Sequence, residues 1–480
     1  MLVSHRRRVS RAACVESLES RVLYAAGDTF FVSLKGSDAN PGDAAHPWRT
    51  IQQAMNAATP GSTVNVLPGR YNEKVSVNVS GNATDGFITF QAAGRGVIIS
   101  GFRKAGPDII FINNQNYVRI LGFDVRDDYN VNNGSGIRIT SGGDHIVIQN
   151  NRIHLITGIS AMGITAYGSE PTRPISNLVV DHNEIFACFS APSETLTLNG
   201  NVNNFTVTNN FIHNVLGIGI DFISGEGICP DPANDIAHDG VCAGNRVLAA
   251  HVRGSRDTAG IWVDGSQNIL VEHNITELND VGIEVGCVNP ALVTRNITVR
   301  SNYVALNRGA GISIGGSDQL AGQVQNCRIT NNTVLLNDLS HAGAGEVRLQ
   351  FASNNTLENN LILAHPGGLL IKSESDAANN ASDYNLLFSG LGVRRSPFQF
   401  GGTRIAGFSA YQAASGQEQH SIFALPVPLR FVNGTLHITS KSRAVNAGDP
   451  AFTGDVGETD IDGDARVLGG RVDIGDDEVA

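Results

Sequence analysis

The strongest constraint in the sequence is a repeat of just under 30 residues that runs through the middle of the chain. Each copy contains apolar residues in alternation with polar ones, then an Asn, then another apolar position. The copies end at Asn151, Asn183, Asn210, Asn245, Asn274, Asn302, Asn332 and Asn360, and an earlier copy has Phe123 at the Asn position. A fixed period of this length indicates a solenoid, because no single repeat buries its apolar face until it stacks on the next.

A second motif alternates with the first: a short strand that usually opens with Gly and an apolar residue. Its copies begin at Gly136, Gly163, Gly219, Gly260, Gly282, Gly311 and Gly368, with Thr195 and Glu346 filling the same position without Gly. Both motifs have the period of two that is typical of strands, separated by Gly and Asn turns. We therefore predict an all-β fold, a right-handed single-stranded parallel β-helix of about nine or ten coils. Stacked Asn side chains at the bends can hydrogen-bond along the solenoid.

The amino-acid composition supports this fold prediction and argues against some classes of binding partner. The 54 Gly residues disfavour long helices, and 41% hydrophobic with 16% charged residues disfavours disorder. The net charge of −11 argues against a nucleic-acid partner, because phosphate binding needs clustered cations. The sequence has no apolar run of about 18 residues, so we expect no membrane span. We expect a monomer.

The ends of the chain depart from the repeat. Residues 1–26 are basic and are interpreted as an export segment or a disordered tail. Residues 27–110 are predicted to form an N-terminal cap and the first coils, with an amphipathic helix within residues 47–58 covering the open apolar end. The repeats occupy residues 111–388. Residues 389–480 are expected to form loops and a segment that closes the other end.

Several stretches resemble segments of known secreted proteins. Residues 31–42, 46–54 and 60–71 resemble the opening of secreted pectate-lyase-like β-helix proteins, and residues 446–450 and 459–475 resemble the C-terminal segment of the choice-of-anchor Q type. Residues 18–23 resemble the bacterial Leu-Glu-x-Arg-x-Leu-Leu export segment, with Ser20 at the usual Pro. The resemblance implies a bacterial protein that is secreted or held at the cell surface and handles a polysaccharide, often an acidic one. In lyases of this kind it also implies Ca²⁺ and a Lys or Arg base.

Alignment of the short strands predicts two outward-facing columns of side chains. The first column places Asp221, Trp262 and Glu284 on consecutive rungs, and the second places Asp264 two residues after Trp262. Rungs lie roughly 4.8 Å apart, so we predict that Asp221, Asp264 and Glu284 form a catalytic cluster. Carboxylates beside an exposed aromatic ring suit a sugar-binding groove. The predicted substrate-binding residues are Trp262, Tyr167, Asn199 and Arg138.

Two reactions fit these three acids. Hydrolysis with inversion needs two carboxyl groups roughly 6.5–9.5 Å apart, and two rungs place Asp221 and Glu284 near the upper limit. β-Elimination on a uronate needs Ca²⁺ held by carboxylates, and a base. Lys372 aligns about four rungs from Asp264, roughly 19 Å away, which counts against a lyase. Sugar binding without turnover, and acids that are merely solvated, remain open alternatives.

The loop at residues 224–242 leaves the coil directly after Asp221 and is rich in acids. Loops on a rigid scaffold often carry function, so we predict a groove wall or a source of calcium ligands. The predicted metal ligands are Asp231, Asp235 and Asp239. Cys229 and Cys242 flank the loop and are the one disulfide pair that we expect.

A second acidic stretch, residues 460–464, alternates its acids in the way of some calcium loops. The Gly within it comes too early for an EF-hand. We interpret this stretch as part of a structural cap, with or without calcium.

The function predicted from these residues is a secreted β-helix protein that binds a polysaccharide, an acidic one being a candidate. Whether the protein also cleaves the polymer, as a lyase or as a glycoside hydrolase, is left open by the sequence. The alternative is a non-catalytic cell-surface or adhesion protein whose β-helix is a rigid scaffold.

Overall fold

The computed structural model describes residues 27–252, 258–316, 320–390, 397–426, 428–432 and 434–479. In these residues the chain forms a parallel β-solenoid of about 12 coils with two short helices. The fold class is therefore confirmed, and the number of coils is slightly larger than expected. None of the described helices is long and apolar enough to cross a membrane.

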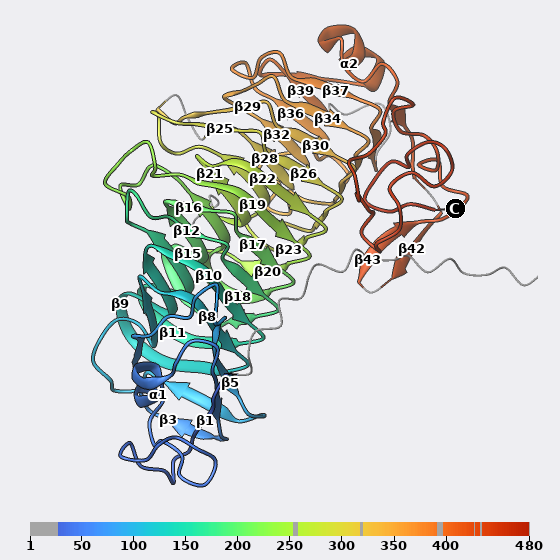
Figure 1. Cartoon of the computed structure of the whole chain (residues 1–480). Coiled ribbons are helices and arrows are strands. Elements are labelled where there is room, and N and C mark those ends of the chain that lie inside the picture. The colour runs from blue at the N-terminus through green and yellow to red at the C-terminus, as the bar shows by residue number, and fades with distance from the viewer. Residues whose placement is uncertain are drawn as a thin grey trace, which may run out of the picture.

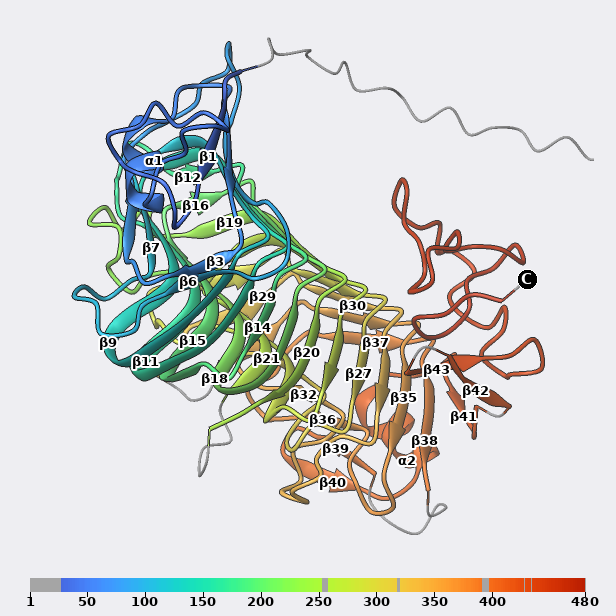
Figure 2. The same ribbon diagram turned by 90° about the horizontal axis from the view of Figure 1, so that it is seen from below.

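Each coil contributes strands to three faces (Figures 1 and 2). The first face consists of β1 (Thr29–Val32), β2 (Thr63–Val66), β5 (Ile88–Ala92), β8 (Asn116–Leu121), β10 (Gly143–Gln149), β13 (Val179–Asp181), β17 (Thr206–Thr208), β19 (Ala237–Ala243), β22 (Gln267–Glu272), β26 (Thr298–Arg300), β30 (Arg328–Thr330), β34 (Thr356–Glu358) and β37 (Ala381–Asp383). The same sheet includes the corner strands β12 (Ile175–Ser176), β16 (Val202–Asn203), β25 (Val293–Arg295), β29 (Gln323–Gln325) and β33 (Ala352–Ser353).

The other two faces belong to one sheet that bends. The second face consists of β3 (Gly69–Tyr71), β6 (Val97–Ser100), β14 (Glu184–Phe186), β20 (Arg246–Ala250), β23 (Ile275–Glu277), β27 (Tyr303–Ala305), β31 (Thr333–Leu335), β35 (Leu361–Ala364), β38 (Leu386–Ser389) and β41 (Ile422–Phe423). The third face consists of β4 (Val75–Val77), β7 (Ile110–Asn113), β15 (Phe189–Gly200), β21 (Ala259–Asp264), β24 (Val281–Gly286), β28 (Ile312–Ile314), β32 (Val347–Leu349), β36 (Ile371–Ser373) and β39 (Phe398–Phe400). Three long strands run across both faces: β9 (Asp124–Ser141), β11 (Arg152–Gly168) and β18 (Phe211–Ile223).

The Asn repeat forms a buried hydrogen-bond ladder at the bend between the first and second faces. The backbone N–H and the side-chain Nδ2 of each Asn donate to Oδ1 of the next Asn, at 2.9–3.1 Å. The ladder runs through Asn151, Asn183, Asn210, Asn245, Asn274, Asn302, Asn332, Asn360 and Asn385. Its last amide donates to the buried carboxylate of Glu418. The predicted ladder is thus confirmed. The left-handed residue of the bend is the one before the ladder position, as at Asn150 and Asn209.

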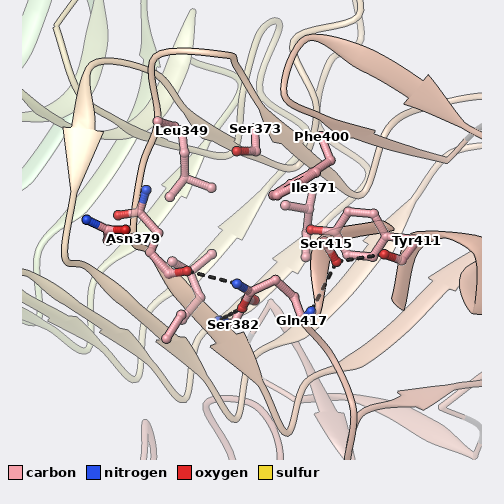
Figure 3. Close-up of a pocket in the computed structure, with 13 residues that line it drawn as sticks. Leu349, Ile371, Ser373, Asn379, Ser382, Phe400, Tyr411, Ser415 and Gln417 are labelled. Atoms are coloured by element: carbon pink, nitrogen blue, oxygen red, sulfur yellow. Dashed lines mark hydrogen bonds between the residues drawn. The ribbon is translucent and has the colours of Figure 1, made fainter. Parts of the chain in front are cut away.

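The two ends of the solenoid are covered differently. Helix α1 (Ile51–Ala57) lies within the predicted range, begins after the Thr50 cap and buries Ile51 and Met55 against the first coils. At the other end, α2 (Phe408–Ser415) stacks Tyr411 on Phe398 at 4.3 Å. The sequence predicts only loops in this region. A cavity of about 270 Å³ remains between the last coils and α2 (Figure 3), and no charged side chain is among the described residues that line it.

The rest of the C-terminal region, beside and beyond α2, forms further strands and a segment that folds back along the solenoid. It contains β40 (Thr403–Ile405), which pairs with β39, and the hairpin of β42 (Leu429–Val432) and β43 (Thr435–Ile438). Residues 436–479 lie along the second face, where Ile438 and Ile474 pack on Leu361 and Leu386 (Figure 2). The free apolar surface of that face explains why the segment folds back onto it.

Candidate functional site

The predicted columns of side chains lie on the third face in the predicted register. Asp221 of β18 pairs with Trp262 of β21, and Trp262 pairs with Glu284 of β24. The neighbouring column pairs Ile223 with Asp264 and Asp264 with Gly286. The three predicted acids therefore occupy three consecutive rungs.

One strand is out of the predicted alignment. Lys372 pairs with Arg348, so it belongs to the first column and not to the second. The reason is local: Gly368 lies in a turn in which its N–H donates to the carbonyl of His365, and β36 begins only at Ile371. Lys372 forms an ion pair with Glu374 at 2.9 Å and lies five rungs from Asp221.

The predicted acids are buried and not exposed as expected. Asp221 is 2% exposed, Glu284 is 6% and Asp264 is 8%. Loops after β18 and β24 account for part of this burial. The N–H of Val288 donates to Asp264 Oδ1 at 2.7 Å, and Asn289 Nδ2 donates to the carbonyl of Gly225 at 2.6 Å.

Two further acids, which the sequence reasoning did not assign, complete the group. Glu194 lies on β15 and Glu226 lies in the loop after β18. Both raise the pKa of Asp221 electrostatically, together with Asp264 and Glu284. We call these five residues the acidic cluster: Glu194, Asp221, Glu226, Asp264 and Glu284. Glu194 follows a register shift in β15, so strand alignment alone could not place it.

Burial and mutual repulsion raise the pKa values of three acids of the cluster, Glu194, Asp221 and Asp264. Burial, then the charge of Glu226, raises the pKa of Asp264 to about 6. Burial, with Glu226 and Asp264 nearby, raises the pKa of Glu194 to about 7. Burial raises the pKa of Asp221 well above its ordinary value. The group therefore holds both protonated and ionised carboxyls near neutral pH, as acid–base catalysis requires.

Several polar atoms beside the acidic cluster are buried and have no hydrogen-bond partner among the described residues. They are Asp221 Oδ1, Thr197 Oγ1, Asn199 Oδ1 and Trp262 Nε1. Buried polar atoms normally have hydrogen-bond partners. A group of such atoms without partners therefore indicates a place where a ligand or water molecules bind. The other end of the Asn199 amide donates to Glu226 Oε2 at 2.9 Å.

Trp262 is half-buried beside these atoms. Its ring packs on a small apolar cluster of Ala259, Val281 and Ala310. A Cβ on Gly286 would lie 2.7 Å from Trp262 Nε1, so the glycine leaves room for the indole over the next rung.

The two remaining predicted substrate ligands differ in position. Tyr167 lies near the acidic cluster. Burial raises its pKa to about 12, and the charges of Glu194 and Glu226 contribute to this rise. Arg138 stacks over the Tyr167 ring at 5.0 Å but is 8% exposed, and its Nε donates to Asp108 Oδ1 at 2.8 Å. We therefore interpret Arg138 as support for Tyr167.

The three predicted metal ligands each accept hydrogen bonds from nearby protein groups. Both Asp235 oxygens accept from backbone N–H groups, those of Gly227 and Cys229. Asp231 accepts from Asn234 Nδ2, and Asp239 from Asn268 Nδ2. The structure does not bring the three predicted metal ligands together. Within the described residues, no three oxygens of these acids or of the acidic cluster lie within 4.8 Å of one another. As placed in this structure, these residues do not fit a calcium ion.

The expected disulfide is wrong. Cys229 and Cys242 are both free thiols, as are the other described cysteines. Cys242 lies on β19 with its side chain in the solenoid core, whereas Cys229 is buried in the loop. Both act as small buried residues.

Comparisons with known proteins agree with the fold. A family described as "Right handed beta helix region" matches residues 259–390, and "Protein of unknown function (DUF1565)" matches residues 34–223. The uncharacterized protein YwoF of Bacillus subtilis (strain 168) is 31% identical over 420 residues, which cover 84% of this chain and 88% of that protein.

Two solved structures have the same fold at low sequence identity. The GH136 lacto-N-biosidase from Eubacterium ramulus has a TM-score of 0.51 at 12% identity, over 74% of this chain and 67% of that one. A complex of XylC with xylose has a TM-score of 0.51 at 11% identity, over 85% of this chain and 88% of that one. These likenesses are of fold.

Proposed function

The chain belongs to the family of the uncharacterized protein YwoF of Bacillus subtilis, and we propose that it binds a carbohydrate polymer at the acidic cluster and cleaves it by hydrolysis. The observation that carries this proposal is a group of three acids with raised pKa values, Glu194, Asp221 and Asp264, next to Trp262 and to unpartnered polar atoms. Carboxylates that only solubilise a surface are exposed and keep ordinary pKa values. An aromatic ring packs on the apolar face of a sugar while polar atoms bind its hydroxyls.

Asp264 and Glu284 are the residues proposed for the chemistry. Parallel-strand geometry separates their Cα atoms by roughly 8 Å, one rung across and two residues along. At that Cα separation the two side chains can hold their carboxyl groups roughly 6.5–9.5 Å apart, the distance that an inverting hydrolase needs. Asp264, whose pKa is about 6, would protonate the leaving glycosidic oxygen, and Glu284 would take a proton from the attacking water.

Asp221 is proposed to support this pair. It is almost fully buried on the rung next to Trp262, and burial raises its pKa well above the ordinary value, which favours the protonated form. A protonated carboxyl adds no negative charge beside Asp264 and can donate a hydrogen bond to a sugar hydroxyl. Tyr167, Asn199 and Trp262 are proposed to bind the polymer.

Hydrolysis is favoured over β-elimination by the position of the cations. Lys372 is five rungs from Asp221 and is paired with Glu374, and Arg138 is paired with Asp108. Neither is placed to take a proton from a sugar bound at Trp262. A uronate at the cleavage point would also face several carboxylates, so we propose a neutral sugar there.

The solved structures with this fold support carbohydrate as the ligand class. One is a lacto-N-biosidase, and the other, XylC, was solved in complex with xylose. Carbohydrate chemistry is therefore within the range of this scaffold, although fold alone does not specify function.

The experiment is a polysaccharide panel of xylan, β-glucan, polygalacturonate and alginate, each with Ca²⁺ and with EDTA. We expect reducing ends to appear without unsaturated, ultraviolet-absorbing product, and the same rate with EDTA. Trp262→Ala should lower the rate at least about 10-fold, because it removes the stacking surface. Unsaturated product would contradict hydrolysis and indicate a lyase. No product on any polymer would favour the non-catalytic scaffold.

We further propose that the protein is exported to the cell surface or the medium as a monomer. The support is the resemblance of residues 18–23 to an export segment and of the C-terminal segment to the choice-of-anchor Q type; residues 1–26 lie outside the described part of the chain. Cell fractionation of chains with and without residues 1–26, and light scattering of the purified protein, would test both statements.

A further inference from the structure

The C-terminal segment on the second face contains a second group of possible ligand atoms, on a different face of the solenoid from the acidic cluster. His437 lies on β43 and is 1% exposed. It faces Asp462, in the acidic stretch of residues 460–464, and Asp477, near the end of the chain. His437 Nδ1 and one oxygen of each Asp lie within 4.8 Å of one another.

The hydrogen bonds of His437 determine which ring nitrogen carries the lone pair. The Thr435 hydroxyl donates to the carbonyl of Val432 at 3.0 Å, so its oxygen accepts from His437 Nε2 at 2.7 Å. In the neutral ring the proton is then on Nε2 and the lone pair is on Nδ1. Nδ1 is buried and has no hydrogen-bond partner among the described residues. A lone pair thus points toward two carboxylates, an arrangement that requires a positive species there, either a proton on Nδ1 or a bound cation.

The distances favour a metal ion over a proton. His437 Nδ1 is 3.4 Å from Asp462 Oδ2 and 3.4 Å from Asp477 Oδ1. A charge-assisted N–H···O bond would draw one carboxylate to about 2.7–2.9 Å. Ligands bound tetrahedrally at the usual Zn–N and Zn–O distances of about 2.0–2.2 Å lie about 3.3–3.5 Å apart. The two separations of 3.4 Å between His437 Nδ1 and the carboxylate oxygens match this distance between ligands of a tetrahedral site.

The surroundings hold the two carboxylates in position. Asp477 Oδ2 accepts from the N–H of Ile438 at 2.9 Å, which leaves Oδ1 for His437. The loop of Asp462 is organised by Asp460, whose oxygens accept from the N–H groups of residues 462, 464 and 478. Asp460 is therefore used by the backbone, so the stretch is not a calcium loop of alternating acids. Asp462 is exposed, which leaves an open side for a water ligand.

We propose that His437, Asp462 and Asp477 bind one Zn²⁺ ion, with water completing the coordination. One imidazole and two carboxylates are ligands that zinc accepts, whereas calcium prefers six to eight oxygens. The ion would join β43 to the acidic stretch and to the chain end, three pieces that are separate in sequence. Its role would be to fasten the C-terminal segment to the second face, where metal binding adds to the stability of folding.

The test uses the full chain, freed of metal with EDTA and exchanged into buffer, and titrated with ZnCl₂ or CaCl₂. The wild type should bind one Zn²⁺ per chain and melt at a higher temperature with zinc than with calcium. Asp462→Asn, an exposed change that leaves folding intact, should weaken zinc binding at least about 100-fold, and His437→Gln should do the same. Asp464→Asn is the matched control: it lies exposed in the same loop and should bind zinc like the wild type.

Two results would overturn the site. One is zinc binding and zinc-dependent melting that are unchanged in Asp462→Asn, because the zinc would then bind elsewhere, for instance at surface histidines. The other is no zinc binding by the wild type, in which case a proton on His437 serves as the cation.

Discussion

Replacing Asp264 with asparagine is expected to raise the free energy of unfolding at pH 8 by about 1–3 kcal/mol, and to lower the rate of hydrolysis at least about 100-fold at pH values below about 6, where Asp264 carries its proton. Stability rises because the variant no longer buries an ionised carboxylate, while Asn Oδ1 can still accept from the N–H of Val288. Activity falls because an amide cannot protonate the leaving oxygen. Opposite effects on stability and activity are typical of functional sites.

The pH dependence follows from the direction of the shift. Burial raises the pKa of Asp264 from 3.8 to about 6, so the folded state keeps its proton at pH values where the unfolded state has lost it. The contribution of the protonated Asp264 to folding stability is complete below about pH 4 and is lost as the pH rises through about 6. The stability gain of Asp264→Asn should therefore be present at pH 8 and absent at pH 4. Urea unfolding at both pH values, with reducing-end assays on the same samples, measures this.

Glu170→Gln is the control for this experiment, because Glu170 is exposed and outside the acidic cluster. It should change neither stability nor rate. If Asp264→Asn lowers stability at pH 8 and keeps the wild-type rate, Asp264 is a structural carboxylate and the proposed role is wrong.

Replacing Asn274 with alanine is expected to lower the free energy of unfolding by about 3–5 kcal/mol. Asn274 is fully buried in the ladder, and its Oδ1 accepts from both the N–H and the Nδ2 of Asn245. Its own Nδ2 donates to the carbonyl of Cys242 and to Asn302 Oδ1. Alanine leaves buried donors and acceptors on both neighbouring coils without partners, and each costs about 1–3 kcal/mol.

Chemical unfolding of Asn274→Ala beside Asn132→Ala tests the ladder. Asn132 is an exposed Asn on β9, and its replacement should cost less than about 0.5 kcal/mol. Similar small losses in both variants would show that the ladder amides contribute little and that apolar stacking alone holds the coils.

The sequence predicted the fold and the register of the site because both depend on a local, repeated pattern. Parallel strands that each open with Gly and an apolar residue align themselves, which placed Asp221, Trp262 and Glu284 correctly. The same rule failed at Lys372, where Gly368 belongs to a turn. A repeat therefore predicts the alignment of strands only where the Gly of each copy opens a strand, and not where that Gly lies in a turn.

Burial and long-range packing could not be predicted from that pattern. The acids are buried partly because the loops after β18 and β24 fold beside them, and loop conformation is not encoded by strand period. The C-terminal segment lies on the second face through contacts such as that of the Asp476 N–H with Thr333 Oγ1, 143 residues away, at 3.1 Å. Such contacts depend on the assembled surface, and so does the group around His437.

The central claim, that carbohydrate binds at the acidic cluster, can be tested by tryptophan fluorescence. The chain has two tryptophans, and Trp48 is 4% exposed and stacked on Phe30 at 4.8 Å in the N-terminal cap. In Trp48→Phe the emission comes from Trp262 alone. Titration of this variant with an oligosaccharide of the polymer that the panel selects should change its emission with saturation, and Trp262→Phe should show no change. Binding of the same oligosaccharide, measured by calorimetry, with no change in Trp262 emission would contradict the claim.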